Sequence, residues 1–395
     1  MQKLMPVFLA LAVGCNSSPA DLGGVARPVG LIPHEGNNQL DILFVVDNSD
    51  SMAEEQANLA QWAEQSLFGT LENEIAAAGE HVSLRIGVVS SDVGVGTQPP
   101  SGSCSVDGDN GALQTIPRLP NCAPPSDPWI EYVDNGDSTF TTNYPSGTLG
   151  EAFACIALLG IQGCGFEQHL ESAKRALDGS NPGNAGFLRA DANLLVAVVA
   201  DEDDCSAIDT HVFDPTQTLV TDELGPPTSF RCAEFGLLCD DQVIAREPAT
   251  YSECVPREDS YLGVPRDYAT FFKSLKADAS QVMVATIVGP PQGLTVVGGQ
   301  LAPAVSPSCQ TVNGTAYPSH RLKAFLDEFP ARNRTDTICR DSFDQPLRDM
   351  ARLALSAALP SPCLSEPVLP DTLSTCRAYD VTNYGTPGET RSELA

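Results

Sequence analysis

The chain is poor in positive charge. Its 395 residues include 22 Lys and Arg against 51 Asp and Glu, which gives a formal net charge of −29. Binding of nucleic acid needs a basic surface that neutralises phosphates, and anionic lipid attracts cationic segments. The composition therefore argues against nucleic acid as a partner and against unaided adsorption to anionic lipid. A hydrophobic content of 42% is still enough for a folded core.

The chain also lacks the common catalytic signatures. None of its five His lies in an H-E-x-x-H pattern, and no G-x-S-x-G elbow, P-loop or dinucleotide glycine fingerprint occurs. No C-x-x-C pair or Cys/His spacing indicates zinc. His169 falls in a predicted helix, where it reads as a partly exposed side chain. We therefore expect that the protein is not an enzyme.

No apolar run is long enough to span a bilayer. The longest early run, residues 4–13, has ten apolar residues after Lys3 and matches the core of a signal peptide. It leads into Ala12-Val13-Gly14-Cys15, which resembles a bacterial lipobox with Leu11 one position early. The resemblance implies a signal peptide at 1–14, a lipid on Cys15 and a tether at 15–40. The alternative is an ordinary secretory signal with an incidental Cys.

The predicted location is the bacterial cell envelope. Asn16 is not the Asp that favours retention in the inner membrane, so we expect an outer-membrane lipoprotein, either periplasmic or facing the surface. The membrane contact would then be made by the lipid on Cys15.

Cysteine usage indicates an oxidising compartment. Without Cys15, 12 of the 13 Cys remain, an even number that suits six disulfides. Short spacings favour the pairs Cys104–Cys122, Cys155–Cys164, Cys309–Cys339 and Cys363–Cys376. Cys205, Cys232, Cys239 and Cys254 would pair among themselves in one of three ways.

A polar cluster follows the first strongly apolar run. Residues 42–46, ILFVV, read as a strand buried on both faces of a parallel sheet. Asp47, Ser49 and Ser51 come directly after it, and alternate side chains can converge on one point. Carboxylate and hydroxyl oxygens are suitable ligands for Mg²⁺ or Ca²⁺. A polar turn at a strand end would look similar.

The order of elements predicts an α/β fold with a doubly wound, mostly parallel sheet flanked by helices. A helix over 53–78 separates the first strand from a second at 82–91, and later strands are expected at 195–200 and 282–288. The strand at 195–200 ends in Asp201. Ligand sites in such sheets lie beyond the carboxyl ends of the strands, so Asp201 is a candidate partner of Asp47.

Three stretches interrupt this pattern. They lie at about 93–150, 207–260 and 291–318; the first is rich in Gly, Pro, Ser and Asp, and the second contains Cys232, Cys239 and Cys254. We interpret them as long disulfide-stapled insertions in one domain over 41–359, with Trp129 and Tyr132 as anchors of the first. Residues 360–395 form a disulfide-stapled C-terminal tail in this reading.

The motif Asp47-x-Ser49-x-Ser51, with Asp201 ending a later strand, resembles the metal-ion-dependent adhesion site (MIDAS) of von Willebrand factor A (VWA) domains. The strings GCGFEQ and DEDDCS also resemble a group of secreted VWA-like lipoproteins from myxobacteria and relatives, over most of residues 41–359. The resemblance implies a VWA/Rossmann-like fold and a divalent cation, Mg or Ca. Asp47, Ser49, Ser51 and Asp201 would hold it, and an acidic group of a protein or envelope ligand would fill its open position.

One part of the family pattern is missing. VWA domains supply a Thr from a Gly-Gly-Thr loop, but the matching segment here is Gly163-Cys164-Gly165-Phe166-Glu167. Thr148, Glu167 or water are possible substitutes. For Glu167 we favour a carboxylate in the first turn of a helix beginning at Phe166.

These observations predict a lipid-anchored envelope protein whose metal site serves protein or ligand binding and adhesion. The alternatives are a disulfide-rich scaffold with a degenerate metal site and, less favoured, a metal-dependent hydrolase.

Overall fold

The computed structural model describes side chains within residues 37–359, except 121, 138, 146, 299–301, 312 and 313. Outside this range it describes only strands at 10–15, 31–34, 361–364, 376–382 and 390–393. The chain divides into two compact units, one of Asn37–Leu359 and one of Met1–Gly36 with Pro360–Ala395. The predicted signal peptide, the lipid on Cys15 and the Cys363–Cys376 pair fall outside the described side chains and stay predictions.

The smaller unit contains two antiparallel sheets. In one, β1 (Ala10–Cys15), β19 (Cys376–Thr382) and β20 (Thr390–Glu393) follow in that order. In the other, β18 (Ser361–Leu364) pairs with β2 (Leu31–His34).

The larger unit is built on one sheet of seven strands in the order β17-β12-β7-β3-β4-β5-β6. Five of them are parallel: β17 (Asn333–Thr337), β12 (Val282–Val288), β7 (Asn193–Val199), β3 (Gln39–Val46) and β4 (Ser83–Ser90). The predicted α/β class with a mostly parallel sheet is therefore confirmed. β5 (Ile130–Asp134) and β6 (Phe140–Thr142) add an antiparallel edge.

Alternate residues of the central strand serve two separate cores. In β3, Ile42 and Phe44 belong to one buried cluster, while Leu43 and Val45 belong to another on the opposite face. Side chains in a strand point alternately to the two faces, so a strand that is apolar at every position must be covered twice. This explains the continuous apolar run in the sequence.

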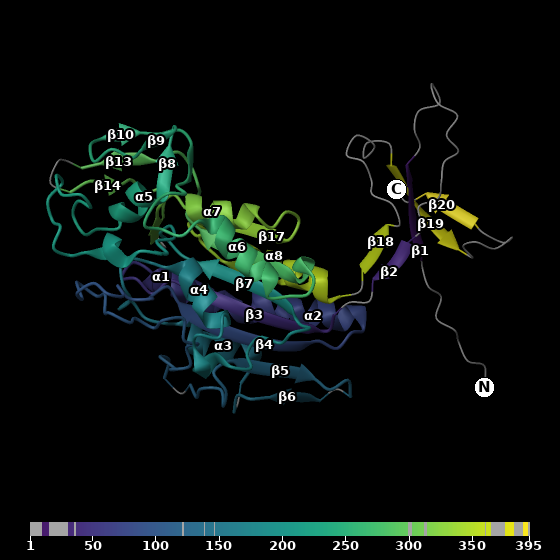
Figure 1. Cartoon of the computed structure of the whole chain (residues 1–395). Helices are drawn as coiled ribbons and strands as arrows, with labels where there is room; N and C mark the ends of the chain where they lie inside the picture. Colours follow the sequence, from purple (N-terminus) through teal and green to yellow (C-terminus); the bar gives the residue numbers. More distant parts are fainter. Residues whose placement is uncertain are drawn as a thin grey trace, which may run out of the picture. The chain divides into compact units, whose positions relative to one another are not determined.

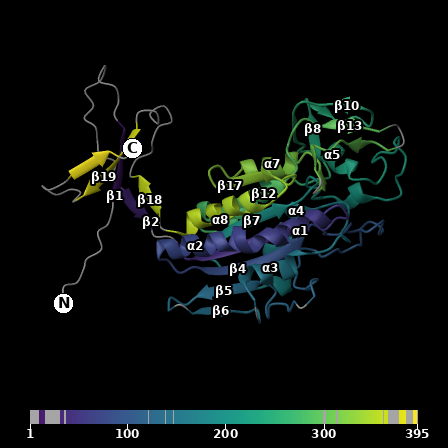
Figure 2. The same cartoon turned by 180° about the vertical axis from the view of Figure 1, so that it is seen from behind.

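Helices form the two covering layers, which the opposite views of Figures 1 and 2 show in turn. One layer holds α1 (Ala53–Trp62), α2 (Gly69–Ala78), α3 (Leu149–Ala157) and α8 (Asp344–Ala358), whose apolar faces share one core. The other holds α4 (His169–Leu177), α6 (Pro265–Ser274) and α7 (His320–Asp327). A sheet covered on both faces in this way suits the doubly wound arrangement.

The helix expected over 53–78 is confirmed, with one irregularity. A π-helical turn, η1 (Ala63–Phe68), joins α1 to α2. Its Leu67 and Phe68 are buried in the core shared with α3 and α8. Gly79 ends α2 in the left-handed conformation, with φ of 69°, as a C-terminal glycine does.

The first insertion is more regular than its composition indicates. Residues 93–150 contribute β5 and β6, which the sequence reading missed because their apolar pattern is short. Trp129 is 8% exposed and packs against Phe187, with ring centroids 6.1 Å apart. Tyr132 stacks on Phe140, with ring centroids 5.0 Å apart. The expectation that both aromatics anchor the segment is confirmed.

The second and third insertions gather at one end of the larger unit, shown at the left of Figure 1. The second supplies α5 (Phe230–Gly236), β8 (Leu237–Cys239), β9 (Gln242–Val243), β10 (Ala249–Thr250) and β11 (Cys254–Pro256). The third supplies β13 (Thr295–Val297), β14 (Ala304–Val305), β15 (Cys309–Thr311) and β16 (Gly314–Ala316). β10 of the second insertion pairs with β13 of the third, so the two fold together.

Single-turn 3-10 helices complete the list of elements. They are η2 (Pro182–Asn184), η3 (Thr210–Phe213) and η4 (Ala279–Gln281).

Five disulfides join described residues, and they correct part of the predicted pairing. Cys309–Cys339 is confirmed. Cys104–Cys122 and Cys155–Cys164 are wrong, because the bridges are Cys104–Cys164 and Cys122–Cys155. Each bridge ties the first insertion to the region of α3, since the fold brings these distant segments together. Among the four undecided Cys, the pairs are Cys205–Cys232 and Cys239–Cys254.

Of the helices that the structure describes, none combines the length and the apolar character needed to cross a membrane.

Candidate functional site

The site lies where the strand order of the sheet reverses. β3 pairs with β4 on one side and with β7 on the other, and the chain visits β4 before it returns to β7. Open α/β sheets bind ligands in the crevice beyond the strand ends at this point. Asp47 follows β3 and Asp201 follows β7 after Ala200, so the fold brings both predicted carboxylates to the same edge.

Asp47 is fully buried and held from several sides. Its backbone N–H donates to the carbonyl of Val199 at 3.0 Å, which fixes the end of β3 to β7. Its Oδ1 accepts the backbone N–H of Ser49 at 2.8 Å and the hydroxyl of Ser91 at 3.1 Å. Its Oδ2 is also buried but has no hydrogen-bond partner. One carboxylate oxygen therefore positions the loop, and the other accepts no hydrogen bond.

The two predicted serine ligands lie beside each other. The Oγ atoms of Ser49 and Ser51 are 3.2 Å apart, as alternate side chains of one loop should be. Ser49 is buried at 4% exposure, whereas Ser51 is exposed. Gln56 in α1 braces the loop, because its side chain donates to the Asp47 carbonyl at 2.8 Å and to the Gly160 carbonyl at 2.9 Å.

Two carboxylates of the acidic loop after β7 have structural partners. Both oxygens of Asp203 accept backbone N–H groups at the start of α7, from Arg321 at 2.8 Å and Leu322 at 3.1 Å. Asp204 pairs with the buried guanidinium of Arg321 at 3.0 Å and accepts the backbone N–H of Leu170 at 3.0 Å. A carboxylate at a helix N-terminus stabilises the helix, and removal of one partner of a buried ion pair is costly because it leaves the other charge buried.

Asp201 lacks partners of this kind. Its side chain is fully buried, and neither of its oxygens has a hydrogen bond of normal geometry. Burial, followed by the neighbouring Asp47 charge, raises the pKa of Asp201 to about 9, against a lowering effect of the nearby Ser51 hydroxyl. Asp201 therefore lies within electrostatic reach of Asp47 and Ser51, and its backbone carbonyl accepts the N–H of Tyr317 at 2.8 Å.

Glu202, next in sequence, is a functional candidate that the sequence reading did not single out. Burial, followed by Asp47, raises the pKa of its carboxyl to about 7, while Ser229 and His169 lower it. The run of four acidic residues did not distinguish Glu202 from Asp203, because only the fold shows which carboxylate is neutralised.

The third loop of the candidate site, Gly163-Cys164-Gly165-Phe166-Glu167, ends in a carboxylate. Gly163 lies against Asn48, since its N–H donates to the Asn48 carbonyl at 2.8 Å and a Cβ there would overlap the Asn48 side chain. Glu167 is 2% exposed, and its Oε2 has no hydrogen-bond partner. Burial, then Glu202, Asp47 and Asp201, raise its pKa well above the usual range.

One expectation about this loop is wrong. The helix begins at His169 rather than Phe166, so Glu167 precedes the helix and is not a carboxylate of its first turn. Thr148 is the N-cap of α3, where it forms a capping box with Glu151 and donates its hydroxyl to Glu64 at 2.7 Å. The hydroxyl of Thr148 is thus used at a helix start.

His169 is also placed differently from the sequence reading. It is fully buried rather than partly exposed, and its Nε2 lies 3.5 Å from Asp47 Oδ2. Burial lowers the pKa of His169, but the attraction of Asp47 outweighs this effect and leaves the pKa above its ordinary value. The sequence gives no indication that His169 is buried beside Asp47, because this contact depends on how α4 packs against β3.

The donor set fits a hard divalent cation. Asp47 Oδ2, both Asp201 oxygens and Glu167 Oε2 are buried without hydrogen bonds. Buried carboxylates are costly unless a positive charge compensates them, and His169, 3.5 Å from Asp47 Oδ2, can supply such a charge to Asp47. Within the described residues, no group of three or more His, Cys, Asp or Glu is arranged to hold a metal. Mg²⁺ sites commonly use one or two carboxylates with waters, which is the composition that Asp47, Asp201, Ser49 and Ser51 would provide.

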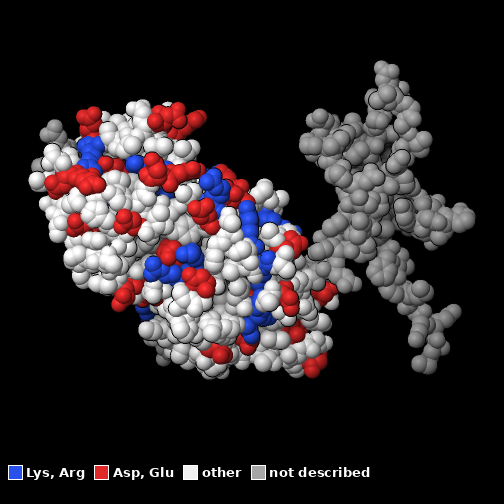
Figure 3. All heavy atoms as spheres, viewed as in Figure 1, with Lys and Arg blue, Asp and Glu red and all other residues white. Residues whose placement is uncertain are grey.

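Positive side chains on the surface are largely paired. Figure 3 shows Lys and Arg intermingled with Asp and Glu on the face in view. Arg175 pairs with Glu171 at 2.8 Å, and Arg348 with Asp344 at 2.8 Å. Cations neutralised by adjacent carboxylates add little attraction for a polyanion.

Comparison with known proteins does not assign a family. No protein-family model matches the chain, and no curated protein matches it. The resemblance to VWA domains is therefore not confirmed by these comparisons and stays an interpretation of the motifs.

The structural neighbours are bacterial pilus adhesins. SpaC from Lactobacillus rhamnosus GG has a TM-score of 0.33 at 10% identity, covering 84% of this chain and 34% of SpaC. RrgA from Streptococcus pneumoniae has a TM-score of 0.30 at 8% identity, covering 91% and 50% respectively. The tip pilin GBS104 from Group B Streptococcus agalactiae has a TM-score of 0.30 at 11% identity. The chain spans about a third of SpaC, and likeness at this level carries no argument about function.

Proposed function

We propose that the chain is a divalent-cation-dependent binding protein with a VWA-like fold. The observation that carries the proposal is the pair of strand ends at the switch point. There, Asp47 Oδ2 and both Asp201 oxygens are buried without hydrogen bonds, and Asp47 Oδ2 faces His169 Nε2 at 3.5 Å. Asp47 and Asp201 would hold the cation with Ser49 and Ser51. The cation would supply a Lewis-acidic position for an acidic group of a protein or envelope ligand.

The residues of the chain have separate tasks in this proposal. Asp203 and Asp204 anchor the loop to α7 through Arg321, and Asp204 also anchors it to α4 through the backbone N–H of Leu170, so the loop does not need the cation for its shape. Gln56 and Ser91 orient Asp47. A prearranged set of oxygens binds with less loss of conformational freedom than a mobile one.

Glu167 distinguishes this site from the VWA pattern. It would add a negative charge where the family has a neutral hydroxyl. Extra carboxylates favour Ca²⁺, which accepts six to eight oxygen ligands and tolerates irregular geometry better than Mg²⁺. We therefore propose that the site prefers Ca²⁺ over Mg²⁺.

Titration calorimetry with Mg²⁺ and Ca²⁺ tests the cation site. We expect binding to the wild type and none to Asp47→Ala. Asp259→Asn is the matched control, because this side chain is 92% exposed and its loss removes one negative charge from the surface. Absence of binding to the wild type, or equal binding to Asp47→Ala, contradicts the proposal.

We also propose that the protein is an outer-membrane lipoprotein anchored through Cys15. The motif at residues 12–15 supports this proposal. Expression in a Gram-negative host with radiolabelled palmitate should label the wild type and leave Cys15→Ser unlabelled. Equal labelling of both would exclude Cys15 as the acceptor.

A further inference from the structure

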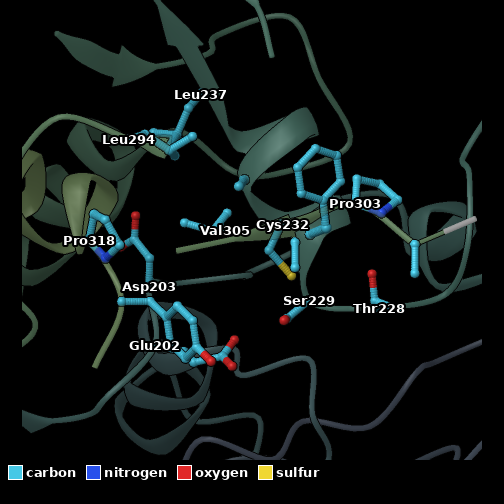
Figure 4. A pocket seen from close by; sticks show the side chains of 15 residues that line it. Glu202, Asp203, Thr228, Ser229, Cys232, Leu237, Leu294, Pro303, Val305 and Pro318 are labelled. Carbon is cyan, nitrogen blue, oxygen red and sulfur yellow. The ribbon is translucent and has the colours of Figure 1, made fainter. Parts of the chain in front are cut away.

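A cavity of about 200 Å³ lies next to the acidic loop that follows β7. Its lining comes from the second and third insertions and includes Ser229, Leu237, Leu294 and Val305, with Glu202 from the loop itself. Figure 4 shows these side chains around the hollow. Segments that the sequence separates by a hundred residues therefore build one cavity.

The cavity and the candidate cation site share a wall. Glu202 lines the cavity and directly follows Asp201 in the chain. Tyr317 lines it as well, and its backbone N–H donates to the Asp201 carbonyl at 2.8 Å. A ligand that reaches the cation through one group is thus close enough to place a neighbouring group in the cavity.

The two ends of the cavity differ in polarity. Figure 4 shows Glu202 and Ser229 at one end, with their oxygens directed toward each other, and Leu237 and Leu294 at the other end. Val305 lies between the two ends. The polar end is the one shared with the acidic loop, and the apolar end is farther from it.

The walls of the cavity are fixed before any ligand binds. Leu237 and Leu294 are each 1% exposed and belong to one buried apolar cluster. The disulfide Cys205–Cys232 ties α5 to the acidic loop, and Cys239–Cys254 closes the strands beside it. A preformed cavity lined mainly by apolar groups with a few polar atoms is typical of a binding site.

We propose that this cavity accepts one bulky aliphatic or aromatic side chain, of Leu or Phe size, from a protein ligand whose acidic side chain binds the cation. The proposal rests on the proposed function of the cation site. Pockets for drug-sized molecules have volumes of about 300–1,000 Å³, so this cavity is suited to one side chain rather than a cofactor. A Lys side chain entering past Glu202 would place its ammonium near Leu237 and Leu294. Asp203 is the other carboxylate of the lining, and its oxygens already accept two backbone N–H groups at the start of α7.

An array of synthetic peptides tests the proposal with the full chain. Each acetylated heptapeptide carries a central Asp among Gly residues, and each other position in turn carries Leu, Phe or Lys. In saturating Ca²⁺, we expect Leu or Phe at one or two positions to increase affinity at least 10-fold over the all-Gly peptide, as burial of such a side chain should. Val305→Trp should fill the cavity and remove this increase. Val297→Trp is the matched control, because Val297 lies on the neighbouring strand, is 42% exposed and is not part of the lining.

The outcomes separate the two proposals. Calorimetry first measures Ca²⁺ binding by the wild type and by Val305→Trp, which should bind equally. If the wild type does not bind Ca²⁺, the cation-site proposal is overturned. If Ca²⁺ binds but no apolar position increases affinity, the cavity proposal is wrong. It is also wrong if Lys gives the larger increase, or if Val305→Trp keeps the preference for Leu and Phe. Loss of the preference in Val297→Trp as well would indicate a general disturbance and would contradict the assignment to this cavity.

Discussion

Replacement of Asp201 by Asn tests whether the buried carboxylates exist to hold a cation. Both carboxylate oxygens of Asp201 are buried without hydrogen bonds, beside the Asp47 charge. Asn keeps the shape of the side chain and removes its charge. The variant should therefore lose cation binding while retaining the fold.

The expected difference in unfolding free energy between Asp201→Asn and the wild type has opposite signs in chelator and in saturating cation. In chelator, an unpartnered buried group costs more as a carboxylate beside the Asp47 charge than as a neutral amide, so Asp201→Asn should be as stable as the wild type or up to about 2 kcal/mol more stable. At a cation concentration 100 times Kd, the wild type gains about 2.7 kcal/mol of unfolding free energy because only the folded state binds. For a domain of this size, the gain raises Tm by about 5 °C. The variant should gain almost nothing, so the order of stability reverses.

Urea and thermal unfolding of both proteins, with EDTA and with saturating Ca²⁺ or Mg²⁺, measure this reversal. Asp203→Asn is the control from the same loop, because its carboxylate accepts two backbone N–H groups at the start of α7. It should lose about 1 kcal/mol in both conditions and keep the gain from the cation. The reasoning is refuted if Asp201→Asn shows the full gain, or if it is less stable than the wild type in EDTA.

Three further predictions concern other parts of the larger unit. In the wild type, the Arg189 guanidinium lies 2.7 Å from the Asp41 carboxylate, and Asp41→Asn removes this buried partner. Urea unfolding should show a loss of about 3 kcal/mol in the free energy of unfolding. An unchanged free energy would contradict the role of this pair. The hydrogen bond of His81 lowers the pKa of Asp134. Its contribution to stability is therefore present at a pH above the ordinary pKa of Asp and is lost as the pH falls through the pKa of folded Asp134. In NMR titrations, His81→Ala should raise the pKa of Asp134, and an unchanged pKa would exclude the contact. Gly163→Ala pushes a Cβ into the loop that follows β3 and should cost about 1–3 kcal/mol in urea unfolding, whereas an unchanged midpoint would show that the two loops are not in close contact.

Much of the architecture follows from local pattern. The run ILFVV is apolar at every position, and only a strand covered on both faces accommodates that pattern. The carboxylates Asp47 and Asp201 follow two such strands, and the rule for parallel sheets then places them at one edge. β5 and β6 within the first predicted insertion were too short to recognise.

The disulfide pairing shows where local reasoning failed. Short spacing favoured Cys104–Cys122 and Cys155–Cys164, yet each Cys of the first insertion bridges to the region around α3. Loop closure becomes only slightly more costly as a loop lengthens. Proximity in the fold therefore decides the pairing more strongly than proximity in the sequence.

The sequence by itself determined the α/β class of the sheet, four of its parallel strands and the carboxylates Asp47 and Asp201 after two of them, because these depend on residues within one segment. Only the tertiary structure decided which acidic side chains are neutralised. Asp203 and Asp204 are bound by the start of α7 and by Arg321, whereas Asp201 is left buried and unpartnered. The tertiary structure also places Glu167 and His169 near Asp47. Desolvation and pairing depend on neighbours from distant segments, and no local pattern contains that information.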